Sequence, residues 1–160
     1  MSTTSNAPQH ADPSAVRVQI DPRGARFTAA LTAVLLAVTL LLAPSPTATV
    51  LVAVQAVLFG VGATRGVQRT PYAWLFRAVV RPRLAPPAEL EDAAPPRFAQ
   101  AVGLVFAVVA LAGFVAGADL LGLVATGFAL VAAVLNAVFG LCLGCEMYLL
   151  LQRSRPSAAR

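Results

Sequence analysis

The chain has no lysine, one histidine and only two cysteines, and charged residues fill just 12% of its 160 positions. A soluble domain carries charge at about a quarter of its positions. One histidine and two cysteines are too few for a disulfide framework or a four-ligand zinc site within one chain. The histidine, His10, lies in a polar N-terminal stretch where no role is expected. No nucleophile elbow or phosphate-binding glycine loop is present, and no cofactor is expected.

What the chain has instead is apolar sequence. Hydrophobic residues make up 58% of it, and the mean hydropathy is +0.76. The natural solvent for such a chain is lipid. We therefore predict an all-α membrane protein with four transmembrane helices. The expected spans cover about residues 27–43, 48–63, 98–118 and 120–142.

All twelve basic residues are arginines, and their placement is uneven. They precede the first apolar run, fill the middle polar segment and end the chain. None lies in the connections near Pro44 and Asp119. This is the pattern of the positive-inside rule, not the basic surface of a nucleic-acid binder. We expect a multi-pass protein of the inner cell membrane with both termini in the cytoplasm and no nucleic-acid partner.

Polar segments divide the chain. Residues 1–20 are predicted to be a disordered tail, 21–153 the transmembrane domain and 154–160 a C-terminal tail. The sequence Asp21-Pro-Arg-Gly is interpreted as a turn before the first span. Residues 71–80 are too short to cross a bilayer and are surrounded by arginines, which predicts a short helix in the interface. A proline-marked extended linker follows it.

The two halves of the chain resemble each other. Arg26-Phe27 introduces the first apolar pair and Arg97-Phe98 the second. The pairs end in Phe59-Gly60 and Phe139-Gly140, and a tyrosine five residues before an arginine follows each. The order indicates two repeated helical hairpins, each followed by a short interfacial helix. Only the second half carries cysteines, which favours a function for them over shared scaffolding.

Cys142 and Cys145 form a C-x-x-C motif that Glu146 follows directly. On a continuous helix these three side chains share one face. Two thiols at this spacing suit thiol–disulfide or persulfide exchange, or soft-metal binding in an oligomer, and packing alone is the simpler alternative. Glu146 is either a solvated charge or an acid that tunes the thiol pKa. The apolar run is too long for a straight span, and either Gly140 or Gly144 is a suitable point for a bend.

The stretch from Asn136 to Tyr148, NAVFGLCLGCEMY, together with Asp21-Pro-Arg and both Arg-Phe pairs, resembles the DUF4395 family of small, mainly actinobacterial membrane proteins. The likeness covers residues 17–153. It marks Asn136, Cys142, Cys145 and Tyr148 as family-motif positions without giving them roles. The family has no known activity, and the resemblance implies only a context of thioredoxin-like or rhodanese-type partner proteins.

The leading hypothesis is thiol–disulfide or persulfide exchange between the cysteine pair and a soluble partner at the cytoplasmic face. One alternative is a small transporter or channel subunit for a sulfur species or a soft metal ion. Another is a structural membrane partner, in which a homodimer holds metal between its subunits. Whether the protein is an enzyme is left open.

Overall fold

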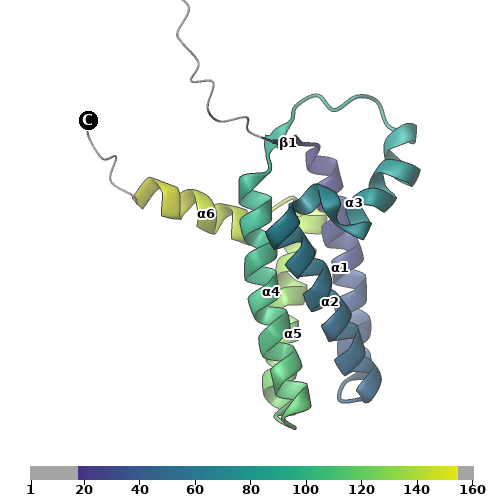
Figure 1. Cartoon of the computed structure of the whole chain (residues 1–160), viewed down its shortest axis with the longest axis vertical. Helices are drawn as coiled ribbons and strands as arrows, with labels where there is room; N and C mark the ends of the chain where they lie inside the picture. The colour runs from purple at the N-terminus through teal and green to yellow at the C-terminus, as the bar shows by residue number, and fades with distance from the viewer. Residues whose placement is uncertain (1–17, 155–160) are drawn as a thin grey trace, which may run out of the picture.

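The computed structural model describes residues 18–154. Its main helices run side by side as a bundle (Figure 1). They are α1 (Pro22–Leu42), α2 (Pro46–Arg65), α4 (Ala94–Val115) and α5 (Asp119–Val134), the last continued by the π-helical turn η4 (Leu135–Phe139). Each of the four, with η4 counted as part of α5, is long and apolar enough to cross a membrane. The prediction of an all-α, four-span membrane protein is confirmed.

The four spans close into a ring. Helix α1 contacts α2 and α5, and α4 contacts the same two helices from the other side. The inner surface is built from small side chains, with Val52, Ala110 and Ala125 forming one buried cluster. Small residues let helix backbones approach closely in a membrane, where lipid competes for every larger apolar contact. Both helices of each predicted hairpin therefore pack against a helix of the other hairpin, α1 against α5 and α2 against α4.

The helices begin earlier than predicted. Asp21 caps α1, because its side chain accepts a hydrogen bond from the backbone N–H of Arg23, and Pro22 occupies the first helical position. The interpretation of this sequence as a turn was wrong. An acidic cap followed by proline is a helix-start signal, since proline has no N–H to lose there. Ser45 and Pro46 start α2 in the same way.

The predicted N-terminal tail ends sooner than residue 20. Its first 17 residues lie outside the described part of the chain, as do residues 155–160 of the predicted C-terminal tail. Gln19–Ile20 form the short strand β1, which pairs antiparallel with β2 (Glu91–Asp92). Ile20 is buried. Burial of this apolar side chain favours the ordered strand over a disordered tail.

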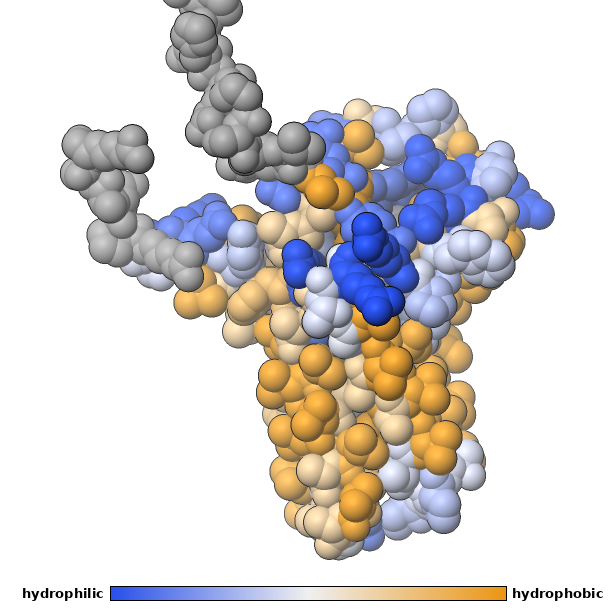
Figure 2. Space-filling view, in the orientation of Figure 1, coloured by the Kyte–Doolittle hydropathy of each residue, from blue (hydrophilic) through white to orange (hydrophobic). Residues whose placement is uncertain are grey.

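The middle segment is helical over the predicted residues 71–80, and further helical turns precede and follow them. It contains η1 (Val67–Arg69), α3 (Pro71–Leu75), the π-helical η2 (Phe76–Val80) and η3 (Arg81–Arg83). Phe76 is buried, and its ring lies 5.7 Å from that of Phe27 on α1. Figure 2 shows hydrophilic residues gathered at this end of the molecule, above an apolar belt around the bundle. This arrangement fits a segment lying at the membrane interface.

The fourth apolar run breaks at Gly140, which settles the choice between two bend points. Gly140 adopts a left-handed φ of 71°, a conformation that glycine adopts without strain. The fourth span therefore ends at Phe139 and not at residue 142 as predicted. Helix α6 (Leu143–Ser154) then leaves the bundle sideways (Figure 1). Gly144 has another role, since it packs α6 against Ala99 of α4.

The structure also changes the alignment of the repeat. Gly66 ends α2 with a φ of 96°, as Gly140 ends η4. Gly60, by contrast, lies inside α2. Phe59-Gly60 is thus not the counterpart of Phe139-Gly140, although the order of hairpin and interfacial helix does occur twice.

Candidate cysteine site and its cavity

Cys142 and Cys145 lie where the chain turns from the bundle into α6. They are paired as a disulfide with Cα atoms 5.2 Å apart. The Cys142 sulfur also accepts a hydrogen bond from the backbone N–H of Cys145 at 3.4 Å, and its carbonyl accepts one from Glu146 at 3.0 Å. Cys142 therefore caps the N-terminus of α6. Both cysteines are half-buried.

The bend divides the single helical face that the sequence predicted. Cys142 precedes α6, whereas Cys145 and Glu146 lie in its first turn. The Glu146 side chain is exposed, and no ion pair joins it to residues 18–154. A negative charge in a first helical turn interacts favourably with the helix dipole. This position matches the solvated charge better than the buried acid of the two alternatives.

The same bend lets Asn136 and the cysteines face one cavity. Six residues apart, Asn136 and Cys142 would point about 120° away from each other on a straight α-helix. In the structure, Asn136, Cys142 and Cys145 all line one cavity of about 980 Å³. The cavity reaches into the arginine-rich end of the bundle between α1, α4 and α5, and α6 borders it.

Polar side chains from three helices face this cavity. The uncharged ones within the spans are Thr28 and Thr32 of α1, Gln100 of α4 and Asn136 of η4, and charged side chains such as Arg26, Arg81 and Glu146 also line the cavity. None of the four side chains has a hydrogen-bond partner within residues 18–154. No fully buried side-chain N or O atom of the described residues lacks a partner, so the polar atoms of these four side chains are not fully buried.

Sequence reasoning assigned none of Thr28, Thr32 and Gln100 to the site. Thr28 and Thr32 are four residues apart and so share a helical face, and this pairing within a span was the available signal. Gln55, by contrast, is buried and has a structural role, because its side chain accepts a hydrogen bond from Tyr72 at 3.3 Å.

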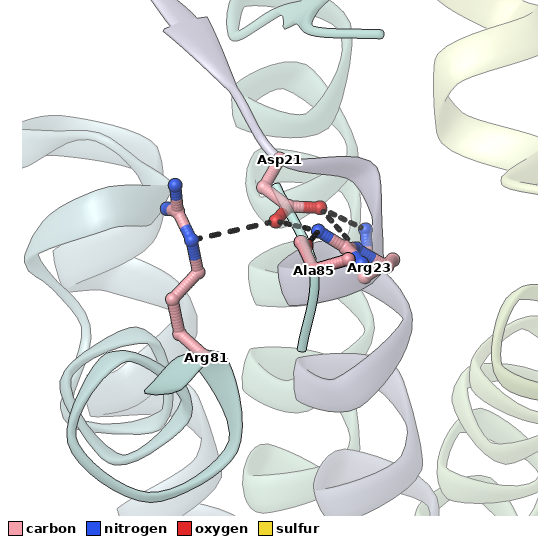
Figure 3. A network of polar contacts seen from close by, with 4 residues as sticks. All are labelled: Asp21, Arg23, Arg81 and Ala85. Carbon is pink, nitrogen blue, oxygen red and sulfur yellow. Dashed lines mark hydrogen bonds and ion pairs between the residues drawn. The ribbon is translucent and has the colours of Figure 1, made fainter. Parts of the chain in front are cut away.

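A second polar cluster lies beside the cavity at the start of α1 (Figure 3). The Asp21 carboxylate accepts hydrogen bonds from the Arg23 guanidinium at 3.1 and 3.0 Å, and Arg81 lies 3.9 Å from it. Arg23 also donates to the carbonyl of Ala85 at 3.0 Å. The bonds from Arg23 hold the pKa of Asp21 below its usual value. The cluster fastens the middle segment to the first span.

Tyr148, the remaining motif position, is not among the residues that line the cavity. Its ring lies 5.7 Å from that of Phe98 on α4, and its hydroxyl accepts a hydrogen bond from Gln152 at 2.6 Å. It thus positions α6 against the bundle and does not line the cavity. No group of three or more His, Cys, Asp or Glu side chains suited to a metal ion occurs in the part of the chain that the structure describes.

These features define a four-span membrane protein with a cysteine pair beside a cavity at one end of its bundle. The family described as a domain of unknown function, DUF4395, matches residues 20–153, and the chain belongs to that family. No curated protein and no solved structure shows significant similarity to it.

Proposed function

We propose that Cys142 and Cys145 carry out reversible thiol exchange with a soluble thioredoxin-like or rhodanese-type protein. The observation that carries the proposal is the placement of the two sulfurs, at bonding distance and half-exposed, at the arginine-rich end of the bundle. Cysteines that served only in packing would be expected inside the bundle and not beside a cavity at the end of a span.

Cys142 is the attacking thiolate in this proposal. Its sulfur lies at the N-terminus of α6, where the Cys145 N–H and the helix dipole both stabilise negative charge. Cys145 lies in the first turn and acts as the resolving thiol. Exposed Glu146 works against the negative charge, but water screens it.

The reaction balances without a further reagent. The Cys142 thiolate attacks the partner's disulfide, which forms a mixed disulfide and releases one partner thiolate. Cys145, as its thiolate, then attacks the Cys142 sulfur, closes the internal disulfide and releases the second partner thiolate. With a persulfide partner, Cys142 takes the outer sulfur atom, and attack by Cys145 releases it as hydrosulfide.

The proposed location is the inner cell membrane, with both termini and the cysteines on the cytoplasmic side. The support is the uneven distribution of arginine along the chain, together with the hydrophilic residues that gather at one end of the molecule (Figure 2). Cytoplasmic thiol proteins would then have direct access to α6, while the hairpin turns near Pro44 and Asp119 would face the other side.

Trapping tests the exchange. Cys145→Ser, purified in nanodiscs, is incubated with an oxidised thioredoxin-like protein, and adducts are resolved on non-reducing gels. We expect a reducible 1:1 adduct with Cys145→Ser and much less with the matched variant Cys142→Ser, which keeps one thiol but not the attacking one. Equal adducts from both variants, or none from either, would refute the mechanism.

Labelling tests the orientation. A membrane-impermeant maleimide is applied to reduced right-side-out and inverted vesicles. We expect both cysteines to react only in inverted vesicles. Labelling in right-side-out vesicles would place the pair on the opposite face and exclude cytoplasmic partners.

A further inference from the structure

The cavity beside the cysteines has the volume of a ligand site. Its volume of about 980 Å³ lies at the upper end of the usual range for small-molecule pockets, roughly 300–1,000 Å³. Along α1 it is lined from Pro22 to Thr32, about 15 Å of helix. It thus reaches from the cysteine end well into the membrane-spanning part of the bundle.

The cavity is also continuous with surface that faces lipid. Phe128 of α5 and Met147 and Leu149 of α6 all line it, yet they remain 61%, 47% and 39% exposed. Figure 2 shows that the α6 arm carries apolar residues on the side toward the apolar belt. An apolar molecule therefore has a route into the cavity from the bilayer beneath α6.

The cavity is polar in a way that the protein itself does not explain. Gln100 and Asn136 bring amide donors into it, and Thr32 adds a hydroxyl deeper along α1. Polar groups within a membrane are expensive unless paired, and these have no side-chain hydrogen-bond partner within residues 18–154. These donors suit a ligand that has both polar acceptors and an apolar tail.

We propose that this cavity binds a lipid-soluble quinone that exchanges electrons with the Cys142–Cys145 pair, an inference that rests on the redox activity proposed above. The amides donate hydrogen bonds to the quinone carbonyls, and the isoprenoid tail leaves past Phe128 under α6. The choice of quinone follows from three features that share one cavity: a two-electron thiol pair, hydrogen-bond donors and an opening to lipid.

The electron transfer is balanced. The reduced dithiol gives up two electrons and two protons and becomes the Cys142–Cys145 disulfide. The quinone takes up both electrons and both protons and becomes the quinol. A soluble dithiol then reduces the Cys142–Cys145 disulfide by the reverse of the exchange described above, and is itself oxidised to a disulfide. The membrane bundle thereby links a soluble thiol pool to the lipid-soluble carrier pool, which gives a reason for a thiol pair to be carried on four spans.

The first test measures turnover at the thiols. Reduced protein in nanodiscs is mixed with decylubiquinone, whose ring is fully substituted so that thiols cannot add to it. We expect loss of quinone absorbance to about one equivalent per protein, together with loss of alkylatable thiols. The Cys142→Ser/Cys145→Ser variant should bind decylubiquinone but not reduce it. Reduction no faster with wild type than with this variant would overturn the proposal.

The second test separates binding from folding. Thr32→Val and Thr39→Val remove the hydroxyls of two buried threonines of α1, of which only Thr32 lines the cavity. Removing one hydrogen bond weakens binding by about tenfold. We expect decylubiquinone affinity to fall with Thr32→Val and Asn136→Leu but not with Thr39→Val. Equal affinities in all three would show that the quinone binds elsewhere.

The outcomes distinguish this inference from the proposed function. Partner adducts with Cys145→Ser but no quinone reduction would overturn the quinone site alone. Quinone reduction without partner adducts would overturn the soluble exchange and leave the quinone site standing. A pair that neither traps a partner nor reduces decylubiquinone would refute both.

Discussion

Arg26 and Arg97 make equivalent contacts, because each donates to the last carbonyls of a helix in the other hairpin. Arg97 of α4 donates to the carbonyls of residues 63 and 64 at 2.7 and 2.8 Å, at the end of α2. Arg26 of α1 donates to those of residues 137 and 138 at 3.4 and 3.0 Å, at the end of the fourth span. Each hairpin thus supplies the cation that caps the second helix of the other. The duplicated Arg-Phe pair has a structural meaning that sequence order alone does not reveal.

Removing either arginine should weaken the bundle. A cation at a helix C-terminus contributes about 0.3–1 kcal/mol when exposed, as both of these are. We expect Arg97→Ala to lower the melting midpoint in detergent, measured by differential scanning fluorimetry. Arg69→Ala is the control, because the Arg69 side chain is exposed and contacts no acid or carbonyl by hydrogen bond among the described residues. Equal losses for both variants would assign the effect to net charge.

Gly144 offers a sharper test of how α6 is held. A Cβ at this position would lie 2.6 Å from the Cα of Ala99, so one of the helices must move. Overpacking of this kind typically costs about 1–3 kcal/mol. We expect Gly144→Ala to loosen α6 and raise the rate at which reduced Cys145 is alkylated.

The matched control is Gly127→Ala. Gly127 is also helical, but a Cβ there meets nothing within 4 Å. Alanine favours helix over glycine, so this variant should be neutral or slightly stabilising. If Gly144→Ala left both stability and alkylation unchanged, the contact with Ala99 could not be what docks α6.

The four spans could be predicted from the sequence, because apolar runs of bilayer length have few alternatives to a membrane-spanning helix. The interfacial helix at residues 71–80 was predicted for a similar reason. Element boundaries were harder. The start of α1 at Pro22 depends on Asp21, and the same Asp-Pro sequence serves equally well in a turn.

The candidate site was found only in part. Cys142 and Cys145 stood out as the only cysteines. The cavity, however, depends on the bend at Gly140, and the sequence allowed a bend at either Gly140 or Gly144. On a straight helix Asn136 would point about 120° away from Cys142, so only the bend lets both residues face the cavity. Thr32 and Gln100 belong to other helices, so only packing of the ring brings them to the same cavity.

Stability should depend on pH through Asp21. Its folded-state pKa is lowered, chiefly by hydrogen bonds from Arg23, so the carboxylate stabilises the fold at pH values above its unfolded pKa of about 3.9. That contribution is lost as the pH falls through the lower folded pKa. We expect the melting midpoint of the wild type to begin to drop below about pH 5 and to go on falling as the pH passes through the folded-state pKa of Asp21.

Asp21→Asn isolates this effect, because asparagine caps a helix as well as aspartate does. The variant should melt below wild type at pH 7, and the gap should narrow as the pH falls. Glu89→Gln, at an exposed position in the connection before β2, is the control. A gap between wild type and Asp21→Asn that stayed constant from pH 7 to pH 3 would contradict the role assigned to the Asp21 charge.

Two variants of Cys142 separate its structural role as the N-cap of α6 from its role in the disulfide. Under reducing conditions, Cys142→Ser keeps a side-chain acceptor for the Cys145 N–H, whereas Cys142→Ala removes it. Loss of an N-cap acceptor costs about 0.5–2 kcal/mol. We expect hydrogen exchange at the Cys145 amide to quicken in Cys142→Ala and to stay close to the reduced wild type in Cys142→Ser. Because neither variant can form the disulfide, equal exchange rates in the two would mean that the cap is unimportant and that the covalent bond alone orders the start of α6.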